Sequence, residues 1–176
     1  MAGVVEAGEG PAAAASRLER IAGAISWISG VIAALLIVIV LAITALSVFK
    51  RYVLGHSLLG VDEATGFLVV AIVMAGAAEA YRRGDHIGID LLLENVGSRT
   101  RWLLDLWADI AVLVFSVLLL VTAWHTVAFS RQFGAYSSGY LELPMWIPQS
   151  TMLLGAALLG LVSLAKIIGR MAGSGR

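Results

Sequence analysis

Glu79 is the ionisable residue whose position most needs an explanation. It lies near the end of an apolar run from Ala64 to Tyr81, and a carboxylate inside a membrane-crossing segment costs a few kcal/mol on insertion scales. Arg83 follows four residues later, a spacing at which glutamate and arginine pair on one face of a helix. We therefore predict a local ion pair between Glu79 and Arg83. A contact with a partner subunit is the alternative use of this carboxylate.

Asp105 and Asp109 form a second pair of acidic residues that could do chemistry. Their spacing of four places both on one face of a helix, and Arg101 precedes Asp105 by the same distance. Two adjacent carboxylates could bind a cation or relay a proton. Both lie near the predicted start of their helix, where the helix dipole favours negative charge. We therefore interpret them first as structural residues in a hydrated helix start.

Three histidines, His56, His86 and His125, are the candidates for a haem site or a histidine-ligated metal site in a chain that contains no cysteine. Such a site needs two or more ligands that converge. His56 and His125 are predicted near one face of the membrane and His86 near the other. His86 and Asp90 have helical i, i+4 spacing but supply only two ligands. We predict no metal, no haem and no other cofactor.

No catalytic motif accompanies these residues. The sequence lacks a nucleophile elbow, a phosphate-binding loop, a zinc-protease HExxH motif and a dinucleotide-binding GxGxxG motif, so we predict that the protein is not an enzyme. The hydroxyl residues of the apolar runs are scattered and are expected to bond back to their own helices. These residues are Ser29, Thr44, Ser47, Ser116, Thr122 and Ser163. They do not form a polar lining for a solute pathway.

The composition requires a membrane environment for these residues. Of the 176 residues, 60% are hydrophobic and 14% are charged, and the mean hydropathy is +0.92. A soluble domain has about a quarter of its residues charged. The formal net charge of zero provides no basic surface for nucleic acid, so no nucleic-acid partner is predicted.

Four apolar runs are predicted to be transmembrane helices, at about 21–49, 63–81, 101–130 and 146–169. Each approaches or exceeds the roughly 20 residues that cross a bilayer, and none shows the alternation of barrel strands. We therefore predict an all-α integral membrane protein, with a membrane domain over 21–170 and tails over 1–20 and 171–176. Asp62 is expected to cap the second helix. Residues 1–11 contain no Lys or Arg, unlike a secretory signal.

The distribution of basic residues predicts the orientation of the helices. Most of the 12 Lys and Arg residues fall in the N-terminal tail, the middle loop and the C-terminal end. Short cytoplasmic loops carry such an excess, so both termini and the middle loop are predicted to face the cytoplasm. Residues 86–96 mix apolar and acidic side chains and are predicted to form a short amphipathic cytoplasmic segment. Residues 12–22 could form a second one, with a disordered tail as the alternative.

The stretch over residues 50–93 resembles the small membrane subunit of TRAP (tripartite ATP-independent periplasmic) transporters. In both, an arginine follows the first helix, an acidic residue opens the second, a small Gly-Ala patch follows, and basic residues precede a His-hydrophobic-x-hydrophobic-Asp run. The matching residues are Arg51, Glu63 with Asp62 beside it, Gly76, Ala77, Arg82, Arg83, His86, Ile87, Ile89 and Asp90. The loop over 131–143 has no recognisable counterpart in this family.

The resemblance implies a division of labour in a bacterial inner membrane. A periplasmic substrate-binding protein captures an organic acid, and a large permease subunit carries the substrate and sodium sites. The small subunit is a non-catalytic scaffold beside the large one. Its motif residues, together with Glu79, would orient helices or contact membrane lipids and the large subunit.

Two other functions are compatible with four apolar helices. One is a membrane-anchor subunit of a redox enzyme that holds haem through histidines. The other is a small transporter or channel that works alone. A self-sufficient transporter often shows an inverted pair of broken helices, and this sequence contains no such repeat.

Overall fold

The computed structural model describes residues 11–56, 58–84 and 97–173. Four long helices make up nearly all of this part of the chain: α1 (Pro11–Val53), α2 (Val61–Arg83), α4 (Ser98–Gln132) and α5 (Trp146–Gly173). All four are long and apolar enough to cross a membrane, which confirms the predicted all-α fold with four transmembrane helices. The predicted segment over 86–96, with His86 and Asp90, lies outside the described residues.

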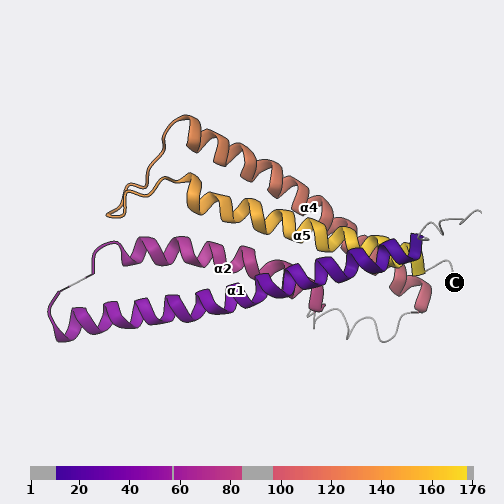
Figure 1. The fold of residues 1–176 in the computed structure, drawn as a ribbon, viewed down its shortest axis with the longest axis horizontal. Coiled ribbons are helices and arrows are strands. Elements are labelled where there is room, and N and C mark those ends of the chain that lie inside the picture. The colour runs from indigo at the N-terminus through magenta and orange to yellow at the C-terminus, as the bar shows by residue number, and fades with distance from the viewer. Residues whose placement is uncertain (1–10, 57, 85–96, 174–176) are drawn as a thin grey trace, which may run out of the picture.

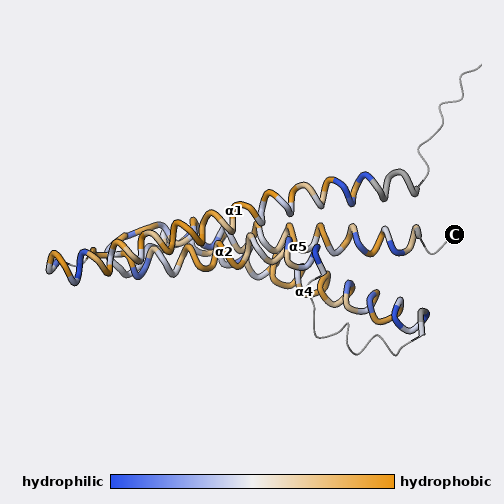
Figure 2. Tube along the Cα trace, turned by 90° about the horizontal axis from the view of Figure 1, so that it is seen from below, coloured by the Kyte–Doolittle hydropathy of each residue, from blue (hydrophilic) through white to orange (hydrophobic). Residues whose placement is uncertain are grey.

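The helices alternate in direction and are arranged around α5. Figure 1 shows α1 beside α2, with α4 and α5 diverging from them toward the end where α1 finishes. At the opposite end, Figure 2 shows α1, α5 and α4 spread apart with α5 in the middle. α5 packs against each of the other three helices, and its apolar span has a larger buried share than theirs. The position of α4 is therefore fixed largely through α5.

The helix bounds follow from local backbone chemistry. α2 begins after Gly60, which has a left-handed φ of 81° and provides no side-chain cap. The expectation that Asp62 caps this helix is wrong. Asp62 lies within the first turn, where a carboxylate still benefits from the helix dipole, and its backbone carbonyl accepts a bond from Thr65. α2 ends at Gly84, whose φ of 74° suits the residue that terminates a helix.

Two helices are longer than their apolar runs. α1 has 43 residues and α4 has 35, against about 20 needed to cross a bilayer. Residues 11–20, which the sequence assigns to a tail, are the first turns of α1. Figure 2 shows hydrophilic residues gathered toward the end where α1 begins and α5 finishes, while hydrophobic residues dominate the rest of each helix.

Small residues make up much of the core. Ala78 and Ala156 are at most 1% exposed, and Ala22 is 2% exposed. Many large apolar side chains point outward instead, including Leu41 at 67% and Leu118 at 63% exposure. This pattern is typical of membrane proteins, in which small residues allow helices to approach closely and large ones face lipid.

Gly155 lies at a close approach of α5 to α2, and its replacement tests this packing. A Cβ atom there would lie 2.7 Å from the backbone oxygen of Met74, and backbone cannot move aside as a flexible side chain can. We expect Gly155→Ala to destabilise the protein by about 1–3 kcal/mol, measured as a lower apparent melting temperature in detergent. Gly66→Ala is the matched control, because a Cβ at Gly66 meets nothing within 4 Å. An unchanged melting temperature for Gly155→Ala would contradict the proposed close contact.

Candidate functional site

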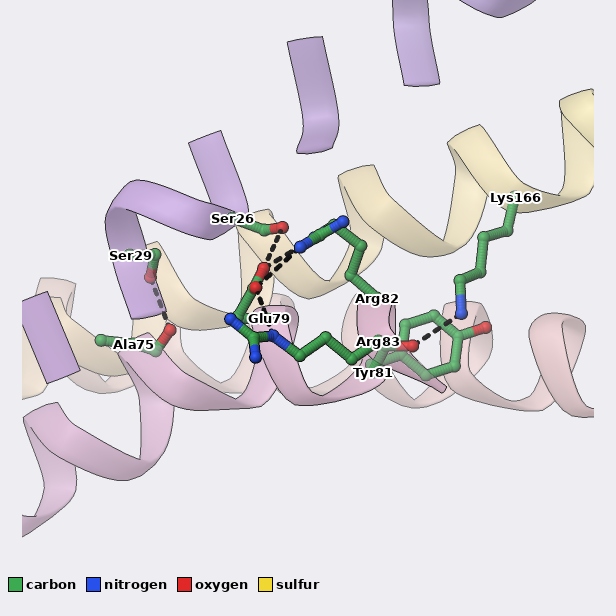
Figure 3. Close-up of polar contacts among 8 residues, drawn as sticks. All are labelled: Ser26, Ser29, Ala75, Glu79, Tyr81, Arg82, Arg83 and Lys166. Atoms are coloured by element: carbon green, nitrogen blue, oxygen red, sulfur yellow. Dashed lines mark hydrogen bonds and ion pairs between the residues drawn. The ribbon is translucent and has the colours of Figure 1, made fainter. Parts of the chain in front are cut away.

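Glu79 is the centre of a buried polar cluster between α1 and α2 (Figure 3). Its side chain is 8% exposed. Arg82 donates through Nε to Oε2 and through Nη2 to Oε1, both at 2.7 Å. Arg83 donates through Nε to Oε1 at 2.7 Å, and Ser26 of α1 donates its hydroxyl to Oε2 at 3.1 Å. The predicted Glu79–Arg83 pair is confirmed, whereas the two-bond contact of Arg82 and the bond from α1 were not foreseen.

Small residues on α1 allow this cluster to form. A Cβ atom at Gly30 would lie 2.7 Å from Cγ of Glu79, so only glycine leaves room for the glutamate stem at this position. One residue earlier, Ser29 donates its hydroxyl to the carbonyl of Ala75 in α2 at 2.5 Å. The expectation that Ser29 bonds back to its own helix is therefore wrong, because the close approach of α2 offers it a carbonyl across the interface.

Asp109 is the centre of a second cluster, which joins α2, α4 and α5. Its side chain is 5% exposed and accepts a bond from Nε of Arg170 at 2.6 Å. The hydroxyl of Tyr81 also donates to it. Arg170 reaches Asp105 as well, through Nη1 at 2.9 Å. The structural interpretation of the two aspartates omitted these ties between helices, which the sequence spacing within α4 could not reveal.

Two residues of α5 complete the second cluster. Ser163 donates its hydroxyl to the backbone carbonyl of Asp109 at 2.6 Å, so its predicted bond within its own helix is also wrong. Lys166 donates to the carbonyl of Tyr81 at 2.6 Å, and its ammonium lies 4.2 Å from the centroid of the Tyr81 ring (Figure 3).

In contrast to Ser29 and Ser163, Ser116 and Thr122 do bond to carbonyls of their own helix. Between them, the two clusters connect all four helices.

A third polar contact holds the hairpin between α4 and α5, residues 133–145. Glu63 in the first turn of α2 accepts bonds from the Ser137 hydroxyl and from the backbone N–H of Leu141. The hairpin is also closed internally, by the Ser137 N–H to the Leu143 carbonyl at 2.8 Å and the Met145 N–H to the Ala135 carbonyl at 2.9 Å. Glu63 therefore links α2 to a segment 74 residues away.

The described residues of the family motif, together with Glu79, fall into two groups at opposite ends of α2. Gly76, Glu79, Arg82 and Arg83 lie toward its end, and a Cβ at Gly76 would be 3.7 Å from Cβ of Ala33. The others lie at the start of α2 or the end of α1: Arg51, Asp62 and Glu63. Both Arg51 and Asp62 are exposed. The motif residues that the structure describes are thus structural ties and surface charges, and they do not form one pocket.

The chemistry available to these clusters is limited by their own bonds. Both oxygens of Glu79 and both oxygens of Asp109 already accept bonds from side chains of this chain. Among residues 11–56, 58–84 and 97–173, no group of three His, Cys, Asp or Glu could hold a metal ion. His56 and His125 are both exposed. The clusters are suited to holding helices in register.

Comparison with known proteins finds relatives of this sequence. A family model described as "Tripartite ATP-independent periplasmic transporters, DctQ component" matches residues 40–173. The chain is similar to the C4-dicarboxylate TRAP transporter small permease protein DctQ of Vibrio cholerae, with 28% identity over 138 residues. That match covers 66% of this chain and 60% of the relative. No solved structure matches the chain.

The bonds to Glu79 predict an order of stability losses. Glu79→Gln leaves two arginines without their carboxylate, Arg82→Gln removes two charged hydrogen bonds, and Arg83→Gln removes one. We expect the melting temperature in detergent to fall most for Glu79→Gln, less for Arg82→Gln and least for Arg83→Gln. The largest loss is about 1–3 kcal/mol, because both arginines are partly exposed. Arg83→Gln having a larger effect than Arg82→Gln would contradict this assignment of the bonds.

Proposed function

The chain belongs to the DctQ component family of tripartite ATP-independent periplasmic transporters, and we propose that it is the small, non-catalytic membrane subunit that scaffolds a large permease subunit. Members of this family are transporter components and not enzymes. With four helices able to cross a membrane, the chain is a multi-pass protein of the bacterial inner membrane.

The scaffold role is supported by the hydrogen bonds that the buried carboxylates accept from other residues of this chain. Glu79 accepts four hydrogen bonds from Ser26, Arg82 and Arg83. Asp109 accepts bonds from Tyr81 and Arg170. A carboxylate that binds a metal cation coordinates it through its oxygens, whereas the oxygens of Glu79 and Asp109 accept bonds from donors of this chain. This arrangement supports a subunit that holds its shape while another subunit carries the ion and the substrate.

The partners and the substrate follow from the proposed subunit role. A large permease subunit would carry the substrate and sodium sites, and a periplasmic binding protein would deliver an organic acid to it. The relative from Vibrio cholerae is named for C4-dicarboxylates, which belong to that class. The match spans 60% of the length of that relative. The haem-anchor alternative finds no support in the family match.

We propose the orientation with both termini in the cytoplasm. The end of the bundle that carries Arg82, Arg83, Lys166 and Arg170 would then lie at the cytoplasmic boundary, in agreement with the preference of basic residues for that side. The α4–α5 hairpin, held by Glu63, would lie at the periplasmic boundary. In this orientation the hairpin is on the side from which a periplasmic binding protein approaches.

Reconstitution in liposomes tests the proposed role directly. We expect the full chain alone to give no uptake of a labelled C4-dicarboxylate under a sodium gradient, because its buried carboxylates are already bonded. Uptake should require the large permease subunit and the binding protein encoded beside it. Omission of this chain from the complete mixture should abolish uptake, and uptake by the chain alone would overturn the scaffold role.

Substitution of three motif residues tests whether their contacts serve assembly. We expect Glu63→Gln, Arg83→Gln and Asp90→Asn each to reduce co-purification with the large subunit, or uptake by the complex. For Glu63 the physical reason is the loss of charge on the acceptor that holds Ser137 and the Leu141 N–H. Arg99→Gln is a matched control, since Arg99 is an exposed cation in the first turn of α4. Normal assembly and uptake in all three variants would remove these residues from the proposed function.

A further inference from the structure

A groove on the face shared by α1 and α2 connects an apolar channel to a positively charged mouth. It has a volume of about 370 Å³. Its apolar part is lined by Gly30, Ala34, Gly76 and Ala80, whose small side chains leave a shallow channel along the seam between the two helices. Both helices belong to the membrane-spanning part of the chain, so the groove opens sideways into the bilayer.

The mouth of the groove combines three residues suited to the boundary between membrane and water. Trp27 is 55% exposed, and tryptophan is enriched at that boundary. Glu79 lines the mouth too, but its oxygens already accept four hydrogen bonds. Arg83 lines the other side, and its side chain is 57% exposed. The mouth therefore presents a guanidinium beside a carboxylate whose oxygens are already occupied.

The charges of the Glu79 cluster, which includes Arg82 behind the mouth, do not balance. Two arginines face one glutamate, so the cluster has one positive charge in excess. Arg83 uses Nε for Glu79, and its terminal nitrogens have no partner within residues 11–56, 58–84 and 97–173. Guanidinium groups bind phosphate with two parallel hydrogen bonds. The excess charge and the open nitrogens together fit one phosphate group.

We propose that this groove binds one anionic phospholipid of the cytoplasmic leaflet. The headgroup phosphate accepts hydrogen bonds from Arg83, and an acyl chain lies along the small-residue channel past Ala34. The cytoplasmic leaflet carries anionic lipids, which attract basic residues near its surface. A phospholipid combines the two features that the groove matches, which are a negative phosphate at the boundary between membrane and water and an apolar acyl chain. A helix of a partner subunit would need a carboxylate at this position to match the same charge.

Native mass spectrometry of the full chain tests the proposal, with phosphatidylglycerol as the probe and phosphatidylcholine as the competing lipid. We expect the wild-type chain to retain one phosphatidylglycerol molecule more tightly than the rest. Arg83→Gln should weaken this retention by about tenfold, as expected for the loss of a charged hydrogen-bond pair. This variant keeps the Arg82–Glu79 bonds and is therefore expected to fold.

Two further variants separate groove binding from general attraction to charge. Ala34→Leu changes no charge but fills the channel, and it should also reduce retention. Arg99→Gln removes one exposed cation elsewhere and should retain the lipid as the wild type does. Equal retention in wild type, Arg83→Gln and Ala34→Leu would overturn the proposal, as would an equal loss in Arg99→Gln.

The groove could instead be covered by a helix of the large subunit, and cross-linking distinguishes this case. The chain contains no cysteine, so Ala34→Cys introduces a unique thiol into the channel. A cross-link from that thiol to the large subunit in membranes would overturn lipid binding at this site. Because the lipid measurement uses the chain alone, its outcome is independent of whether the chain supports transport.

Discussion

The structure depends on one constraint, which is that apolar helices in lipid gain little from burying apolar surface against each other. Lipid tails are as apolar as leucine, so helix association must come from close packing and polar contacts. This chain uses both at the same places. Gly30 brings α1 against Glu79, and Gly155 brings α5 against the backbone of Met74. Many large side chains face outward, where they match the lipid.

Of close packing and polar contacts, the contacts of buried charges restrict the arrangement of the helices more. A carboxylate inside the bilayer is stable only when its partners are fixed, so Glu79 and Asp109 restrict the bundle to arrangements that keep their donors in place. Glu79 takes its donors from α1 and α2. Asp109 takes its donors from α2 and α5. Since α2 contributes to both clusters, a shift of any one helix breaks bonds in at least one of them.

The sequence predicted what depends on local spacing and missed what depends on helix register. The four helices follow from apolar run length, and the Glu79–Arg83 pair follows from a spacing of four. Ser26 was not foreseen, because α1 is apolar on nearly every side and its pattern does not mark the face that meets α2. Arg170 and Asp109 are 61 residues apart, and no local rule connects them. The hairpin bond of Glu63 was missed because the loop over 131–143 matched no known pattern.

The same residues show how a motif can mark structure without marking a reaction site. Arg51, Asp62 and Glu63 lie at one end of the α1–α2 pair, while Glu79, Arg82 and Arg83 lie toward the other end of α2, so a single substrate cannot contact both groups. At each end, the acidic residue with the most bonds holds a neighbouring segment: Glu79 holds α1, and Glu63 holds the α4–α5 hairpin. The exception is Arg83, which keeps part of its hydrogen-bonding capacity after pairing with Glu79. Because the side chain of Arg83 is 57% exposed, that remaining capacity points outside the bundle, toward the surrounding membrane.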